Sequence, residues 1–224
     1  MTEQVDRRAD ATRLQILLAA AREFARKSYS QVSLDDILAQ AEVTKGAMYF
    51  HFRSKHELAL AIIERQNATC TELVAEVLGR KLSGLETLVD ISCVMANRDI
   101  GDVVGRAGLN LLESIGRADG VQARVLDTWV GAFADVVRRA VGEGDVSADR
   151  DAEEVSRLLV TVFMGMRQTT DIDDPKRYFA DLQKNWALIL PGFANPDRIG
   201  YLNQFIKRRA ALAAGKATPL NPMK

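Results

Sequence analysis

Residues 33–55, SLDDILAQAEVTKGAMYFHFRSK, predict two short helices joined by a tight turn, and this pair decides the fold. Ser33 precedes the first helix as an N-cap, and Asp36 three residues later completes the outline of a capping box. The turn falls at Glu42, and Thr44 caps the second helix. The apolar residues of the first helix recur at helical spacing: Leu34, Ile37, Leu38 and Ala41.

The second helix has one apolar face and one face suited to DNA. Met48 and Phe52 stand four residues apart and are expected to point into the core. Phe50 either joins the core or touches the edge of the DNA backbone, and we favour the core. The outward face combines a cation, two very small residues, a phenol and an imidazole: Lys45, Gly46, Ala47, Tyr49 and His51. Each of these alone is an ordinary surface residue. Together with the cap, the turn and Lys55, they predict a helix that reads DNA.

The residue types suggest a role for each member of this face. Lys45 is the candidate for a guanine contact, Gly46 lets the backbone approach the groove, and Ala47 offers a methyl group to thymine. Thr44 caps the helix, contacts phosphate, or does both. The expected phosphate contacts are Tyr49, His51, Lys55 and the helix N-terminus at Ser33. With few long side chains for reading bases, part of the specificity is expected from DNA shape.

The composition is that of an ordinary globular protein. The 224 residues are 47% hydrophobic and 27% charged, and the formal net charge is zero. Residues 1–56 carry 9 Lys and Arg against 7 Asp and Glu, so the charge asymmetry is small. DNA binding must therefore depend on where the charges lie rather than on their number.

Helical periodicity continues along the chain without any strand alternation, so we expect an all-α fold of nine or ten helices. A three-helix DNA-binding head is predicted over 1–53, a larger helical body over 54–213, and a flexible tail over 214–224. Ser54 and Glu57 form a second capping box, which opens a long helix directly after Phe52. With no linker at that point, the head is coupled rigidly to the body.

The ends of the helices are predicted from their flanking residues. Residues 1–10 are charged and expected to be loosely ordered, with Thr12 capping the first helix. The last helix is expected to fray from Lys207 onward. Other helix starts are predicted at Ser83, Asp151, Asp174–Pro175 and Asn195–Pro196.

Several classes of function are disfavoured. Cys70 and Cys93 are expected to be buried free thiols. The polar N-terminus and the short apolar runs predict a cytoplasmic protein that does not enter the membrane. His51 and His56 have no neighbours at metal-ligand spacing, so we expect no metal, no cofactor and no enzyme activity. The acidic cluster at 171–174 is expected to be the solvent-exposed start of a helix rather than a cation site.

The stretch VTKGAMYFHFRSKHELALAI, residues 43–62, closely resembles the DNA-binding signature of the TetR family of transcriptional regulators. The resemblance implies a repressor that binds operator DNA as a homodimer, or as a pair of dimers, and is released when the body binds a ligand. The family usually has glycine where this chain has Glu42. A residue with positive φ at that turn costs about 1 kcal/mol when it is not glycine.

Three segments of the body resemble the γ-butyrolactone receptors, a branch of the same family: RAGLNLL (106–112), VLDTWVGAF (125–133) and NWALILPGF (185–193). In that branch the tryptophan matching Trp129 lines the effector pocket, whereas spacing alone favours a core role for it. The candidate pocket residues are mostly apolar: Trp129, Phe133, Val94, Leu109, Phe163, Met164 and Met166.

The remaining apolar surface suggests how two chains pair. Trp186, Leu182, Ile189 and the last helix are assigned to a dimer interface, which would present two reading helices about one DNA turn apart to a pseudo-palindromic operator. Two alternatives stay open. One is a TetR-type repressor of an efflux or catabolic operon that senses another apolar ligand, and the other is an architectural DNA-binding protein with no effector.

Overall fold

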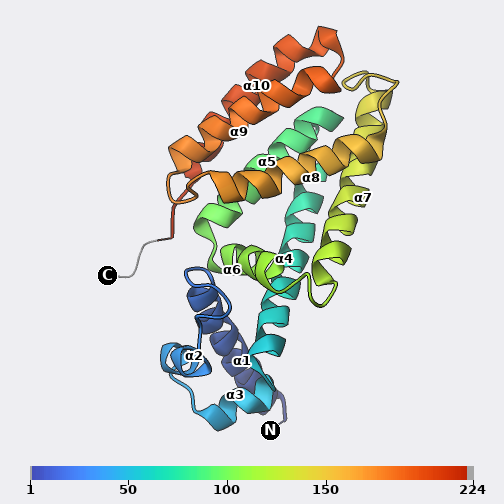
Figure 1. The fold of residues 1–224 in the computed structure, drawn as a ribbon. Helices are drawn as coiled ribbons and strands as arrows, with labels where there is room; N and C mark the ends of the chain where they lie inside the picture. The colour runs from blue at the N-terminus through green and yellow to red at the C-terminus, as the bar shows by residue number, and fades with distance from the viewer. Residues whose placement is uncertain (1, 221–224) are drawn as a thin grey trace. The chain divides into compact units, whose positions relative to one another are not determined.

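The computed structural model describes residues 2–220, and within them it is built from ten α-helices and one short 3₁₀ helix (Figure 1). The described residues contain no β-strand, and the one extended pairing is an isolated antiparallel bridge between Val146 and Ala194. The prediction of an all-α fold is confirmed. The helices are α1 (Thr2–Phe24), α2 (Leu34–Ala41), α3 (Lys45–His51), α4 (Lys55–Leu78), α5 (Gly84–Gly101), α6 (Val103–Ser114), α7 (Val121–Gly142), α8 (Ala152–Thr169), α9 (Pro175–Ile189), η1 (Leu190–Gly192) and α10 (Pro196–Lys216).

The helices form two compact units, and each unit is made of two separate segments of the chain. The first unit holds residues 2–69 and 102–123, and the second holds residues 70–101 and 124–220. Helix α4 therefore begins in the first unit and ends in the second. The functional division expected after residue 53 remains a prediction, since the compact first unit also takes in residues 55–69 of α4 and the whole of α6.

In the first unit, α6 is fastened to both α1 and α4. A Cβ added at Gly108 would lie 2.4 Å from the Cβ of Gln66, so only glycine allows α6 to cross α4 this closely. The side-chain amide of Asn110 donates to the Phe24 carbonyl at 3.1 Å, which satisfies a carbonyl at the C-terminal end of α1. The segment RAGLNLL thus has a structural role in holding the helices behind the DNA-reading pair.

In the second unit, buried charges are paired across helices. Arg167 of α8 donates from Nε to Asp99 of α5 at 2.6 Å, and both side chains are almost completely buried. Asp90 of α5 is fully buried and is paired with Arg209 of α10 and with Arg80. These pairs specify how α8 and α10 lie against α5, because any other arrangement would leave a charge buried without a partner.

Most predicted helix starts are confirmed. Ser83 accepts from the Glu86 N–H and donates its own N–H to the Glu86 carboxylate, which completes that capping box. The Ser54 box differs, because the Glu57 carboxylate accepts from the N–H of Arg53 rather than that of Ser54. Side-chain caps also stand before the other predicted helices: Asp151, Asp174 and Asn195.

The predicted ends of the outermost helices were wrong. Helix α1 starts at Thr2 rather than after Thr12, and α10 runs to Lys216 without fraying at Lys207. Ala210 and Ala213 of α10 pack into the core of the second unit, and this burial explains the longer helix. Of the predicted tail, residues 221–224 lie outside the described residues, and Leu220 donates its N–H to the Ile100 carbonyl at 3.3 Å.

Both cysteines are buried and form no disulfide. Burial raises the pKa of the Cys93 thiol to about 12, so the thiol stays protonated and unreactive near neutral pH. Within residues 2–220, no helix combines the length and apolar character needed to cross a membrane.

Candidate DNA-reading and effector sites

The turn between α2 and α3 is closed by a residue in the left-handed region. Glu42 has φ 52° and ψ 39°, and its N–H donates back to the carbonyl of Ala39 at 3.3 Å. It is the one described residue other than glycine with positive φ. The sequence predicted this conformation from the glycine that the family usually has there. The backbone strain of a left-handed Glu42 lies in the turn that sets the direction of α3.

Helix α3 is positioned by one cap and two buried side chains. Thr44 accepts from the Ala47 N–H at 3.2 Å, as predicted for a cap. Met48 and Phe52 are buried, and the Arg13 guanidinium of α1 lies 4.8 Å from the centre of the Phe52 ring. These contacts turn the opposite face of α3 outward and hold its angle against α1.

The outward face carries most of the predicted DNA contacts. Lys45, Gly46 and Tyr49 are exposed, whereas Ala47 and His51 are half-buried on its flank. A Cβ at Gly46 would meet only the Thr44 hydroxyl, at 3.9 Å, so the outer surface is open there. The arrangement leaves a cation, a phenol and a bare stretch of backbone free to approach a groove.

The prediction for Phe50 was wrong, because its side chain is 80% exposed rather than buried in the core. The helical phase of position 50 indicates its exposure. At 100° per residue, position 50 lies about 200° around the helix from the buried Met48. Within MYFHF, residues 48–52, the two ends are buried, whereas Tyr49 and Phe50 are exposed.

At the start of α2, the predicted phosphate site is partly used by the protein itself. The Ser33 hydroxyl accepts from the Asp36 N–H at 3.1 Å, and the Ser33 N–H donates to the Asp36 carboxylate at 3.0 Å. These bonds hold the pKa of Asp36 below its usual value. Asp35 and Asp36 place two acidic residues in this first turn, which disfavours an anion there, so the Ser33 contact stays a prediction with weaker support.

Lys55 has a structural role that the sequence did not reveal. Its ammonium donates to the carbonyls of Tyr29 and Val32, both at 2.9 Å, and lies 4.2 Å from the centre of the Tyr29 ring. Two of its three N–H groups are therefore engaged with the loop between α1 and α2. A phosphate contact by Lys55 remains a prediction that only the third N–H can serve.

A second overlooked contact joins the start of α4 to the loop after α6. The His56 imidazole lies 2.9 Å from the Asp119 carboxylate, and its ring meets the Tyr29 ring edge-on at 6.4 Å. Burial, together with the nearby charge of Asp119, raises the pKa of Tyr29. Nothing in the spacing of these residues signals the contact, because 63 positions separate His56 from Asp119.

The predicted effector residues are divided between the two compact units. Leu109 lies in the first unit and is buried. The other six belong to the second unit. Met166 is buried and forms part of its core, which favours a packing role for that residue. The remaining five are half-buried on α5, α7 and α8: Val94, Trp129, Phe133, Phe163 and Met164.

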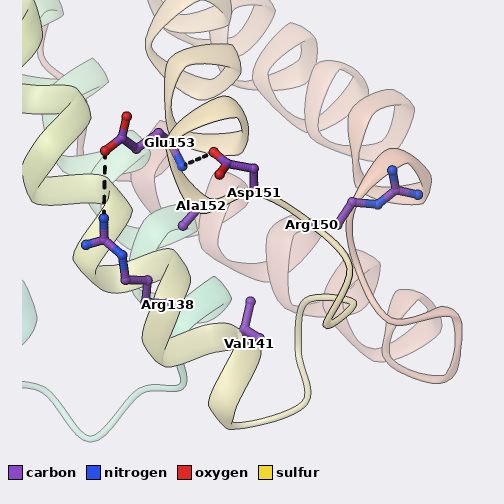
Figure 2. A pocket seen from close by; sticks show the side chains of 6 residues that line it. All are labelled: Arg138, Val141, Arg150, Asp151, Ala152 and Glu153. Atoms are coloured by element: carbon purple, nitrogen blue, oxygen red, sulfur yellow. Dashed lines mark hydrogen bonds and ion pairs between the residues drawn. The ribbon is translucent and has the colours of Figure 1, made fainter.

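A pocket of about 320 Å³ lies elsewhere, between the end of α7 and the start of α8 (Figure 2). Arg138 reaches Glu153 at 3.9 Å, and Asp151 caps α8 by accepting from the Glu153 N–H at 2.9 Å. Arg150 extends away from the other lining side chains. None of the predicted effector residues lines this hollow, and its charged walls do not suit an apolar ligand.

The fold and the capped helix pair agree with the comparisons to known proteins. Residues 16–62 match the model of the bacterial regulatory proteins of the tetR family. Over 200 residues the chain is 30% identical to the A-factor receptor protein of Streptomyces griseus, a match that covers 87% of this chain and 68% of the relative. The chain belongs to the TetR family.

Similar solved structures indicate the branch of the TetR family to which this protein belongs. A γ-butyrolactone receptor described as an ArpA-like protein is 30% identical, with a TM-score of 0.76 over 92% of this chain and 98% of the other. CprB from Streptomyces coelicolor, in complex with its biological operator sequence, is 32% identical, with a TM-score of 0.77 over 92% and 99%. The protein is therefore a TetR-family regulator of the γ-butyrolactone receptor branch.

Membership of this family establishes the broad function. TetR-family proteins are ligand-responsive, DNA-binding transcriptional regulators and not enzymes.

Proposed function

We propose that this TetR-family regulator represses transcription by binding a pseudo-palindromic operator as a homodimer, and that a small lipophilic effector of the γ-butyrolactone type releases it. The observation that carries the proposal is the position of α3. Its N-terminus is capped by Thr44 and its inner side chain Met48 is buried, which leaves Lys45, Gly46 and Tyr49 facing outward. The likeness to a relative bound to its operator supports the DNA part, and the likeness to γ-butyrolactone receptors supports the choice of effector.

On the DNA side, Lys45 donates to guanine in the major groove, and Gly46 and Ala47 let the helix sit deeply enough for that contact. Tyr49 and His51 contact phosphates on the flanks, Thr44 contributes its N-cap, and Lys55 and Ser33 add further phosphate contacts. The near-neutral charge of the whole chain means that binding depends on these few placed groups.

The proposed dimer interface keeps the last helix, α10, and uses the outer face of α9 in place of Trp186 and Leu182. Trp186 and Leu182 are buried within their own unit, where Trp186 donates to the Ser92 hydroxyl at 3.1 Å, so those two assignments were wrong. Leu188 is 78% exposed and Leu212 is 56% exposed. Large apolar side chains of this kind are typical of surfaces that pair with another chain.

The dimer proposal is tested by sedimentation of the full-length protein. Leu188→Glu and Leu212→Glu are expected to shift it toward monomer, because each places a carboxylate in an apolar interface. Leu78→Glu, at the exposed end of α4, serves as the control and is expected to leave the dimer intact. An unchanged dimer in both α9 and α10 variants would exclude this interface.

On the effector side, Trp129 and Phe133 stand four residues apart on α7 and offer two aromatic rings from one stripe of the helix. Val94 of α5 and Phe163 and Met164 of α8 complete the apolar part of the proposed site, with Met166 as an outer member. An effector shifts the regulator from its DNA-binding form only as far as it binds the other form more tightly. Helix α4 provides a continuous element from the second unit to the head.

The central experiment is a gel-shift assay on the DNA upstream of the coding sequence, titrated with γ-butyrolactones and with furans. We expect a specific shift that butyrolactones reverse and that Trp129→Ala makes insensitive to them. Lys45→Ala is expected to lose about 1–3 kcal/mol of specific binding and to relax the sequence preference. Tyr49→Phe should weaken binding to all sequences alike, as expected for a phosphate contact.

The alternatives give different results in the same assay. Release by other apolar compounds but not by butyrolactones would favour a repressor of an efflux or catabolic operon. A shift that no small molecule relieves would favour an architectural protein. Equal binding to every DNA sequence would contradict the operator proposal itself.

A further inference from the structure

Phe50 occupies the outermost line of the reading helix α3. It lies four residues after Gly46 and about 200° around the helix from the buried Met48, so Gly46 and Phe50 form the ridge farthest from the core. The side chain of Phe50 is 80% exposed, the largest exposed fraction among the bulky apolar residues described. A phenyl ring in this position offers a large apolar area for contact with a partner.

The Phe50 ring has a defined orientation. It meets the His51 ring edge-on, with 5.0 Å between centroids and an interplanar angle of 86°. One turn earlier, the bare surface at Gly46 lets the start of the helix enter a groove, and the ring follows on the same line. Tyr49 is exposed beside it, with a hydroxyl suited to phosphate.

The chemistry of the ring selects its partner on DNA. Phenylalanine has no hydrogen-bonding group, so it gains nothing from phosphate oxygens or from the donors and acceptors of base edges. The apolar feature of the major groove is the C5 methyl group of thymine, and phenylalanine is among the side chains that contact it. We propose that Phe50 determines sequence specificity by packing its ring against a thymine methyl group in each half-site.

This inference deepens the DNA-reading function and is independent of the effector and of the details of dimerisation. It also assigns the apolar reading contact mainly to Phe50. Ala47, which the sequence suggested for thymine, is half-buried and carries a single methyl group. Lys45 and Phe50 would then read a guanine and a thymine from two successive turns of one short helix.

The test starts from the full-length protein and a pool of random double-stranded DNA, from which a preferred site is selected. Each thymine of that site is replaced in turn by deoxyuridine, which keeps the base pair and removes only the C5 methyl group. For the wild-type protein we expect affinity to fall about fourfold at one thymine per half-site, the effect of removing one buried methyl group.

The decisive variant is Phe50→Ala, which is expected to bind the selected site more weakly and to be indifferent to deoxyuridine at that same position. Phe50→Leu, which keeps apolar bulk, should retain part of the sensitivity. Tyr49→Phe is the matched control, because it weakens binding while leaving the deoxyuridine effect at its wild-type size. Since Phe50 is exposed, these variants are expected to keep the wild-type melting temperature.

Two results would overturn the proposal. One is a Phe50→Ala protein that remains as sensitive to deoxyuridine as the wild type at every thymine, which would assign the ring to the sugar–phosphate backbone or to another protein. The other is a selected site in which no thymine responds to loss of its methyl group. Failure to select any preferred site would instead contradict operator binding and remove this inference with it.

Discussion

Helices α2 and α3 are capped by hydrogen bonds between near neighbours in sequence, whereas α5, α8 and α10 are joined by ion pairs between residues far apart. Ser33 and Asp36 are three residues apart, as are Thr44 and Ala47. In the second unit, Asp99 is 68 positions from Arg167, and Asp90 is 119 from Arg209. The DNA-reading pair is thus specified locally, while the unit proposed to sense the effector is specified by its tertiary packing.

This contrast has a thermodynamic consequence. A broken cap exposes backbone groups to water at a helix end, where solvent replaces most of the lost bond. A broken buried ion pair leaves a charge without water and without a partner. Substitutions in the second unit are therefore expected to cost more free energy of unfolding than substitutions of comparable size in α2 and α3.

The largest expected effect is that of Asp99→Ala. It leaves the Arg167 guanidinium, whose side chain is 3% exposed, without its carboxylate and should lower the free energy of unfolding by about 3–5 kcal/mol. Urea unfolding at a fixed protein concentration measures the change. Asp135→Ala, which breaks the exposed pair with Arg138, is the control and is expected to cost about 0–1 kcal/mol. Equal costs for the two variants would break the comparison between buried and exposed pairs.

Next in size is Gly108→Ala in α6. The added Cβ would lie 2.4 Å from the Cβ of Gln66, and this overpacking should cost about 1–3 kcal/mol. Gly131→Ala in α7 is the matched control, because a Cβ there meets nothing within 4 Å. That control should stabilise the protein by about 1 kcal/mol through helix propensity alone. Thermal unfolding of both variants separates the two effects, and a stabilised Gly108→Ala protein would refute the close crossing of α6 and α4.

Glu42→Gly should stabilise the turn between α2 and α3 by up to about 1 kcal/mol. Glycine removes the cost of φ 52° but has more freedom to lose on folding, so the net gain is modest. Chemical unfolding gives the size of the gain, and Glu42→Asn should fall between the two. A loss of stability with glycine would show that the Glu42 side chain makes a compensating interaction.

The smallest effect is expected from Ser33→Ala, which removes a cap at an exposed helix end and should cost about 1 kcal/mol. Because the Ser33 hydroxyl holds the pKa of Asp36 below its usual 3.8, the variant should raise that pKa, as read from an NMR titration of the carboxyl. A lowered pKa in the folded protein stabilises it above pH 3.8, and this contribution is lost as the pH falls through the lowered value. An unchanged Asp36 titration would contradict the capping box in solution.

Much of the reading site could be predicted because its signals are short-range. The caps at Ser33 and Thr44 and the buried Met48 and Phe52 follow from local rules of helix geometry. The left-handed residue at Glu42 was expected from the glycine that the family usually has there. Phe50 was assigned wrongly to the core, although its helical phase, about 200° from the buried Met48, places it on the outer face.

The sequence by itself determined the all-α class, the helix starts and the DNA-reading pair, since each depends on side chains that interact within one or two turns. Only the tertiary structure decided that Lys55 binds the loop at Tyr29, that His56 meets Asp119, and that Trp186 is buried within its own unit. These contacts join residues tens of positions apart. Helical periodicity tells which face of a helix is apolar, but it does not tell which other helix, or which other chain, will cover that face.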